Sequence, residues 1–310
     1  MTLPLVHLDG RVVPMAEARV PPTSAGFLCG AGTFTTARLV AGRLWQWPLH
    51  RLRLEAGCAA LGFDPRATRV ESLEAETRAL AEAAGAPPDA LARIQLFEGA
   101  GPLWPEPAAP GSASNAATHP GERPIGPGGR STAAHGPADH PDRPVHRLIL
   151  LRPAPAPRPP ARVGFSDWRV FSNAPLRGLK LLSYAEPWRA MEAARANGFD
   201  EAIRANERGE VAGACRAGVL WSRDGEVFGP DSSCGGLEST TRAWAIGKLQ
   251  ARGRKVTLGA FPVSEVAGAE ELILFSAGVG AWSAAEFQSR PLAGEGGRVA
   301  TDLGKAFTPA

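Results

Sequence analysis

The feature that most constrains the fold is a long stretch, from about Gly99 to Pro144, in which Pro, Gly, Ala, Ser and His replace the aliphatic residues. A segment of this composition cannot bury enough apolar surface to offset the conformational entropy lost on ordering. We therefore expect residues 99–145 to form a disordered insertion. The cores must come from the flanking parts, and 44% hydrophobic residues in a chain of 310 suffice for two medium-sized domains.

Histidines are concentrated in and beside this stretch, which raises the question of a metal site. Four of the six lie there, at positions 119, 135, 140 and 146. Their spacing is irregular, and no carboxylate or cysteine pattern accompanies them, which speaks against a metal-binding tract. We predict no metal site in the chain.

Before the insertion, the sequence predicts a small α+β domain over residues 1–98. An Asp9-Gly10 turn between two short apolar runs is typical of a β-hairpin. Apolar residues in a 3-4-3 spacing predict a helix over 49–61, and a second helix is expected over 72–84. Strands are expected over 34–39 and 92–97.

After the insertion, residues 146–160 read as a connecting strand and a Pro-rich linker, and residues 161–310 as a larger domain. Helices are expected there over 186–197 and 240–252. Short strands segregated from a few helices indicate an α+β fold rather than a doubly wound sheet. The strands are expected at 163–171, 201–204, 217–222, 226–228, 255–258 and 272–275, the last two finishing the core.

The net charge and the positions of the cysteines limit which binding partners and which cellular compartment are expected. The net charge of +3 comes from arginines spread along the chain, so neither a nucleic acid nor a membrane is expected as partner. The N-terminus lacks the features of a signal peptide, and no apolar run is long enough to span a membrane. Cysteines 29, 58, 215 and 234 are far apart and form no CxxC pair, so we expect a soluble protein in the reducing cytoplasm.

Lysine is rare in this chain, which makes each one informative. Only four occur, at 180, 248, 255 and 305, although Lys and Arg together number 34. Lys180 lies in the apolar run Leu176–Tyr184, where loss of hydration would lower its pKa and favour the neutral, nucleophilic amine that forms Schiff bases. The alternative is a lysine at a strand end whose ammonium reaches water.

Five segments follow one another along the chain: Gly26–Arg38, His50–Leu54, Gly178–Tyr184, Cys234–Arg242 and Phe275–Trp282. In this order they resemble the motifs of the class IV, fold-type IV pyridoxal-phosphate enzymes. These include branched-chain and D-amino-acid aminotransferases and aminodeoxychorismate lyase. The resemblance implies the two-domain α+β fold of the D-amino-acid aminotransferase type, with a cofactor cleft between the domains and the cofactor bound by the C-terminal one.

The resemblance also implies roles for single residues. Lys180 takes the place of the family's Schiff-base lysine, which carries pyridoxal 5'-phosphate. Arg53, in a segment similar to "H-x-x-R-L", takes the place of the phosphate-binding arginine, and a guanidinium fork suits phosphate well; the alternative is a solvated helix face. The remaining positions are Thr240 and Thr241 at a helix N-terminus that suits an anion, Ser276 beside the cofactor, and Thr36, Arg38 and Gly278 around the substrate.

One position departs from the family pattern. Gly213 stands where the family has a glutamate that pairs with the pyridine nitrogen of the cofactor. A carboxylate there keeps the ring protonated and electron-withdrawing, so its loss should weaken the cofactor's electron sink. Glu210 lies three residues earlier, and an odd offset on a strand points to the opposite face. We therefore expect Glu210 to be a poor substitute.

The segments "F-T-T-A-R" and "S-A-G-V" favour aminodeoxychorismate lyase, which eliminates pyruvate to give 4-aminobenzoate, a folate precursor. A branched-chain or D-amino-acid aminotransferase is the alternative. Because of Gly213, a catalytically impaired member with a binding or regulatory role also stays open, as does a different chemistry in the same cleft. The resemblance further implies a small-molecule amino substrate and a homodimer.

Overall fold

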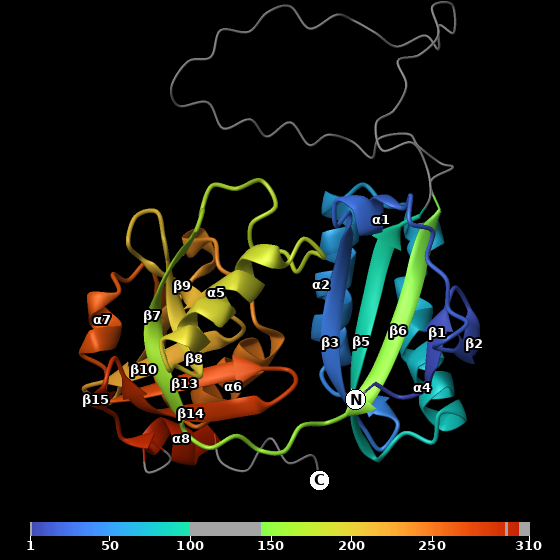
Figure 1. Cartoon of the computed structure of the whole chain (residues 1–310). Coiled ribbons are helices and arrows are strands. Elements are labelled where there is room, and N and C mark those ends of the chain that lie inside the picture. The colour runs from blue at the N-terminus through green and yellow to red at the C-terminus, as the bar shows by residue number, and fades with distance from the viewer. Residues whose placement is uncertain (1, 100–143, 295–296, 304–310) are drawn as a thin grey trace, which may run out of the picture.

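The structure is a computed structural model that describes residues 2–99, 144–294 and 297–303. Most of the expected insertion, with histidines 119, 135 and 140, lies outside the described residues, as does Lys305. The described part contains two β-sheets that lie side by side, each with its own helices (Figure 1). This mixed α+β architecture confirms the expected fold class.

The first sheet has six antiparallel strands in the order β2-β1-β6-β5-β3-β4. The expected hairpin is present, and Asp9 and Gly10 have φ values of 50° and 88°, as a type I′ turn requires. The strands are β1 (Leu5–Leu8), β2 (Arg11–Pro14), β3 (Gly32–Val40), β4 (Arg43–Leu44), β5 (Asp89–Glu98) and β6 (Val145–Pro153). The segment expected to connect two domains thus contributes its strand to this sheet.

Helices α2 (Trp47–Ala60) and α4 (Leu73–Ala83) pack on this sheet, as their spacing predicted. Leu54 of α2 and Leu80 of α4 are fully buried in the same cluster as Ile94 of β5. Two shorter helices, α1 (Ala25–Leu28) and α3 (Pro65–Thr68), complete this half. This core covers one face of the first sheet. The side chains of β3 and β5 on the opposite face are therefore available to line a site.

The second sheet has the order β12-β11-β10-β13-β14-β7-β8-β9, with β15 paired to β14. Strand β7 runs parallel to both of its neighbours, and β11 and β12 are also parallel. The strands are β7 (Ala161–Val170), β8 (Glu201–Asn206), β9 (Val211–Ala214), β10 (Gly218–Arg223), β11 (Glu226–Pro230), β12 (Val256–Gly259), β13 (Glu271–Ser276), β14 (Gly280–Phe287) and β15 (Arg290–Pro291).

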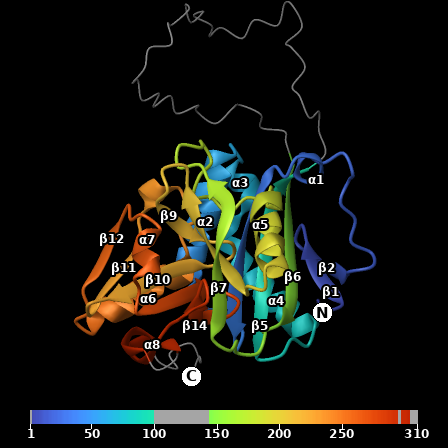
Figure 2. The same cartoon turned by 60° about the vertical axis from the view of Figure 1, so that its left-hand side comes forward.

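Four helices accompany the second sheet: α5 (Ala185–Ala196), α6 (Thr240–Ala251), α7 (Ser264–Ala267) and α8 (Arg298–Leu303). Helices α6 and α8 lie together beside β10 and β13 and share a buried cluster with Leu220 and Phe275 (Figure 2). Helix α5 packs on β7 and β8 through Ala190 and Met191. None of the described helices has the length and apolar content needed to cross a membrane.

Strand β14 was not expected from the sequence, and the prediction that residues 272–275 finish the core is wrong. This strand lies inside the sheet, between β13 and β7. Its sequence, Gly280–Phe287, contains three alanines, and alanine has low strand propensity. The pairing with two neighbouring strands stabilises it. Strand β9, with the sequence Val-Ala-Gly-Ala, was missed for the same reason.

The two halves meet where the segment before α5 lies along β3. The carbonyl of Lys180 accepts hydrogen bonds from the Phe34 N–H (2.9 Å) and the Thr33 hydroxyl (3.1 Å). Glycine permits this contact, because a Cβ at Gly32 would lie 2.6 Å from Leu182 and one at Gly30 2.7 Å from the Ser183 nitrogen. The Gly-rich first segment therefore brings Lys180 to the junction. We propose that this junction separates two domains, with residues 161–310 forming the second.

Candidate active site

A cavity of about 660 Å³ lies at the junction and is lined by both halves. The first half contributes Phe34 and Thr36 from β3, Arg53 from α2 and Arg93 from β5. The second half contributes most of the remaining wall. Of the residues that the sequence pointed to, Lys180, Arg53, Thr240, Ser276, Gly213, Thr36 and Gly278 line this one cavity.

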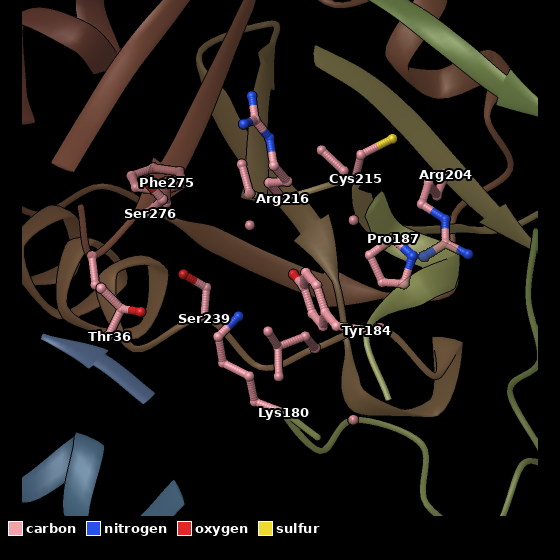
Figure 3. Close-up of a pocket in the computed structure, with 18 of the residues that line it drawn as sticks. Thr36, Lys180, Tyr184, Pro187, Arg204, Cys215, Arg216, Ser239, Phe275 and Ser276 are labelled. Carbon is pink, nitrogen blue, oxygen red and sulfur yellow. The ribbon is translucent and has the colours of Figure 1, made fainter. Parts of the chain in front are cut away.

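Lys180 points into the cavity, toward the same space as Ser239 (Figure 3). Its ammonium nitrogen lies 4.6 Å from the ring centre of Phe34 and 4.8 Å from that of Tyr184. Removal from bulk water, with a smaller contribution from the charges of Arg53 and Arg93, lowers the pKa of Lys180 to about 7. A substantial fraction of the amine is therefore neutral, and hence nucleophilic, near pH 7.

Arg53 is held by a chain of hydrogen bonds that begins at a buried histidine. The His50 Nδ1 lies 2.7 Å from the Thr35 hydroxyl, and that hydroxyl accepts from the Arg53 Nη1 at 3.5 Å. The Arg53 Nη2 donates to the carbonyl of Glu238, just before α6. Burial lowers the pKa of His50 to about 3, so His50 is neutral and adds no charge beside Arg53. In the sequence, His50 only begins the segment similar to "H-x-x-R-L", and nothing there indicates this role.

The N-terminus of α6 faces Arg53. Ser239 is the N-cap, and its hydroxyl accepts from the Arg242 N–H at 3.2 Å. The N–H groups of Thr240 and Thr241, in the first turn, have no partner inside the helix. Thr240 lines the cavity, whereas the Thr241 side chain is fully buried behind it, and its hydroxyl has no partner among the described residues. Together with the Arg53 guanidinium, this turn offers positive charge and free N–H donors of the kind that suits an anion.

The expected substrate residues are only partly brought together. Thr36 and Gly278 line the cavity, as does Ser276 at the end of β13, which was expected beside the cofactor. Arg38, two residues beyond Thr36 on β3, does not line it. Its Nε donates to the Asp89 carboxylate at 2.6 Å, and its Nη2 donates to the other oxygen. Both ends of the guanidinium fork are therefore occupied by this ion pair.

Gly213 lines the cavity with a backbone conformation that suits glycine, at φ 146°. A Cβ there would meet nothing closer than the Ala217 carbonyl at 3.7 Å, so the position has room but an unfavourable backbone. Glu210 does not line the cavity, and its carboxylate accepts from Asn206 (2.8 Å) and Arg208 (2.6 Å). The expectation that Glu210 is a poor substitute therefore agrees with its position.

The cavity lining is rich in arginine. Among the described residues, only two carboxylates line it, those of Glu186 and Glu201. Glu201 is fully buried, with an Oε1 that accepts from the N–H groups of Ala202 (3.2 Å) and Arg216 (3.3 Å). The arginines of the lining are Arg53, Arg93, Arg152, Arg158, Arg177, Arg204 and Arg216. This excess of cations favours ligands with several negative charges.

The sequence matches the profile of the amino-transferase class IV family over residues 125–287, more than half of the 310 residues. The chain belongs to the class IV aminotransferase family. A comparison of the sequence with curated proteins finds no match. Membership confirms the resemblance drawn from the five segments, and it makes the chain a member of a family of enzymes.

Solved structures of this family share the fold. A branched-chain aminotransferase from the archaeon Thermoproteus uzoniensis, with norvaline, superposes with a TM-score of 0.79 at 21% identity, over 99% of this chain and 94% of that one. The 4-amino-4-deoxychorismate lyase from Pseudomonas aeruginosa gives 0.75 at 21% identity, over 98% of both chains. The branched-chain amino acid aminotransferase from Escherichia coli gives 0.81 at 17% identity, over 98% of this chain and 93% of that one.

Class IV aminotransferases use pyridoxal 5'-phosphate, and a further structure of this fold, at 22% identity, is a branched-chain aminotransferase complexed with N-(5'-phosphopyridoxyl)-L-glutamate. The residues of the cavity fit this cofactor. A lysine with a lowered pKa can capture the aldehyde, while Arg53 and the first turn of α6 offer donors for the phosphate. The loop before α6 approaches β9 so closely that a Cβ at Gly236 would lie 1.7 Å from the Ala212 carbonyl. The one mismatch is the missing carboxylate at Gly213.

Proposed function

We propose that this chain is an aminodeoxychorismate lyase, which eliminates pyruvate to give the folate precursor 4-aminobenzoate. The observation that carries this proposal is the arginine-rich cavity around a single amine. Arg93 and Arg152 come from the neighbouring strands β5 and β6 and form no ion pair within the described part of the chain. Aminodeoxychorismate has two carboxylates, which such a surface would bind and orient.

In this proposal Lys180 acts twice. When bound, pyridoxal phosphate supplies an aldehyde that captures amines and a ring that withdraws electrons from the substrate. Elimination of pyruvate requires loss of one ring proton from the substrate and protonation of the departing enolpyruvyl group. Lys180, with a pKa of about 7, can take the first proton and donate the second. Phe34 and Tyr184 flank the amine and limit the access of water.

The lyase assay tests this function directly. Purified protein loaded with pyridoxal phosphate should release 4-aminobenzoate and pyruvate in equal amounts from aminodeoxychorismate. Arg152→Ala should raise KM for this substrate with little change in kcat, because it removes binding and leaves the amine in place. Transfer of amino groups between glutamate and branched-chain 2-oxo acids, without 4-aminobenzoate, would identify a branched-chain aminotransferase instead.

The second candidate is a family member with impaired catalysis, and Gly213 favours it. Without the glutamate, cofactor binding would be retained while carbanion stabilisation is weakened. Normal spectral changes on loading with pyridoxal phosphate, together with no turnover of aminodeoxychorismate or of common amino donors, would support this candidate. Measurable turnover that is lost in Lys180→Ala would contradict it.

We also propose that the protein is a homodimer in the cytoplasm. Phe27 and Leu28 on α1 and Leu52 on α2 are 71%, 52% and 61% exposed, and large apolar side chains left in contact with water are candidates for a subunit interface. The four cysteines are free thiols, as expected in a reducing compartment. Sedimentation equilibrium should give twice the chain mass of 32.4 kDa. Leu52→Asp should shift the equilibrium to monomers if α2 forms part of the interface.

A further inference from the structure

An arginine lies directly opposite the position where the family motif has its glutamate. In the antiparallel pair of β8 and β9, Arg204 is the partner of Gly213. Directly opposite residues of an antiparallel pair project to the same face of the sheet. The Arg204 side chain therefore leaves the sheet on the side where a carboxylate at 213 would lie, and Arg204 lines the cavity.

The Arg204 guanidinium is fixed in this place. Its Nε donates to the Trp168 carbonyl at 2.8 Å, and its Nη2 donates to the Arg169 carbonyl at 3.0 Å and to the Glu186 carboxylate. The register of β7 against β8 shifts between Ser166 and Val170, around these two carbonyls. None of the described residues accepts a hydrogen bond from the Nη1 of Arg204. The side chain is thus rigid and keeps unused donors.

Arg204 also lies at the appropriate end of the cavity. Ser239, the N-cap of α6, marks the helix end that would bind the phosphate, and it lies on the other side of Tyr184 from Arg204 (Figure 3). Arg204, Pro187 and Cys215 lie together on the far side. A pyridine ring whose phosphate is bound near α6 and whose aldehyde meets Lys180 would direct its nitrogen away from both, toward β8 and β9.

The other charged groups of this wall do not replace the missing carboxylate. Glu186 pairs with Arg204 itself. Glu201 accepts from two backbone N–H groups, and its Oε2 lies 3.8 Å from the Arg216 Nε. Arg158 adds a further positive charge, and burial raises the pKa of the Tyr184 hydroxyl, which therefore stays neutral. This part of the cavity lining thus carries three arginines, Arg158, Arg204 and Arg216. Its two carboxylates, Glu186 and Glu201, already have partners.

We infer that Arg204 faces the pyridine nitrogen of bound pyridoxal phosphate and keeps this nitrogen unprotonated. A guanidinium only donates hydrogen bonds, so it can pair with the nitrogen lone pair but not with a pyridinium N–H. A nearby positive charge also disfavours protonation. The inference rests on the cofactor placement in the proposed function. The ring nitrogen would thus face a positive charge in this protein, whereas the family motif places a negative charge there.

The protonation state can be measured without any turnover. The wild-type protein is loaded with pyridoxal phosphate labelled with ¹⁵N in the ring, and the nitrogen chemical shift is recorded from slightly acidic to slightly basic pH. We expect the shift of an unprotonated pyridine throughout this range. The shift of a pyridinium at neutral pH would overturn the inference and would point to Glu201 as the partner. A protein that binds no cofactor would instead contradict the proposed function.

Variants test whether Arg204 is the cause. Arg204→Gln removes the charge and should raise the pKa of the ring nitrogen by about 1–3 units, whereas Arg204→Lys keeps the charge and should leave it low. Arg152→Gln is the matched control. It removes the same charge from the side of the cavity that the first half lines, and it should have little effect on the pKa of the ring nitrogen. An equal rise in both Gln variants would show that the general field, and not Arg204, controls the nitrogen. If Arg204→Gln does not fold, the wild-type spectrum still decides.

Discussion

Lys180 combines an unusual pKa with a fixed surrounding of aromatic and cationic groups. Its pKa of about 7 lies well below the ordinary value of 10.5, mainly because the amine is removed from bulk water. The face of Phe34 favours the ammonium, while Arg53 and Arg93 oppose it. The amine can thus change its protonation state near neutral pH, as a group that captures an aldehyde and then transfers protons must do.

The first prediction concerns the pH dependence of cofactor capture. Only the neutral amine attacks the aldehyde, so the rate at which the apoprotein takes up pyridoxal phosphate should rise with pH and level off above about pH 7. Arg93→Ala removes a charge that lowers this pKa, so the midpoint should move to higher pH. Stopped-flow absorbance gives the rates. Borohydride reduction and peptide mapping should find the label on Lys180, and labelling of Lys248 or Lys255 would contradict the assignment.

A second prediction at this scale concerns Gly213. Its φ of 146° is accessible to glycine and strained for other residues, although a Cβ has room. Gly213→Ala should therefore lower the free energy of unfolding by about 1–3 kcal/mol, measured by urea denaturation. Gly247→Ala, in the middle of α6 with open space around it, should instead stabilise by up to about 1 kcal/mol. Gly213→Glu carries the same backbone cost and should lower the free energy of unfolding in the same way.

Helices α2 and α6 belong to different halves of the molecule, and both contribute donors to the proposed phosphate site. On α2, His50 and Arg53 are three residues apart and therefore lie on one face, where the Thr35 hydroxyl joins them. On α6, the N-cap Ser239 leaves the N–H groups of Thr240 and Thr241 free for a ligand. Neither the Arg53 side chain nor the N-terminus of α6 would hold a phosphate as firmly alone.

Removal of one of these donors should lower the affinity for the cofactor. Arg53→Ala removes a charged donor and should weaken the binding of pyridoxal phosphate by about 1.5–3 kcal/mol, as measured by equilibrium dialysis. Arg51→Ala is the matched control on the same helix, because Arg51 is exposed and pairs with Glu55 at 2.7 Å, away from the cavity. Equal affinities of the two variants would show that Arg53 does not bind the phosphate.

The sequence predicted the helices and most strands well and missed parts of the second sheet. Periodic apolar spacing predicted α2, the helices α4 and α6 were also expected, and the ordered motifs singled out Lys180 and Arg53, which line one cavity. Strand β14 carried no such signal, because its alanines are stabilised by β13 and β7 rather than by their own propensity. The pairing of Arg204 with Gly213 could not be predicted, since it depends on the register across a bulge.

The described chain breaks off and resumes at neighbouring positions of the first sheet, on either side of residues 100–143. Strands β5 and β6 pair from Ala90 with Pro153 to Glu98 with Val145, and the Gly99 N–H donates to the Pro144 carbonyl at 2.7 Å. The pairing of β5 with β6 thus extends to the last described residues on either side of residues 100–143. Lengthening a loop between two paired strands costs little, about 0.6 kcal/mol for each doubling.

Removal of the insertion should therefore leave both sheets intact. Replacement of residues 100–143 by a short Asn-Gly turn is expected to keep the fold, because the strand ends already lie within hydrogen-bonding distance. The melting temperature without cofactor and the absorption spectrum with pyridoxal phosphate should resemble those of the full chain. A protein that no longer folds would show that these residues contribute to the core. Retained folding with lost dimerisation would assign them to an interface.

The backbone of Lys180 is anchored to β3 through its carbonyl, which accepts from Phe34 and Thr33, while Leu182 donates to the Gly32 carbonyl at 2.8 Å. The residue itself cannot shift without breaking the junction. The amine can therefore move only by rotation about the bonds of its own side chain, whose length is fixed. In the proposed lyase reaction, a substrate would therefore be processed only if both of its atoms that exchange protons with the amine lie within reach of this one side chain.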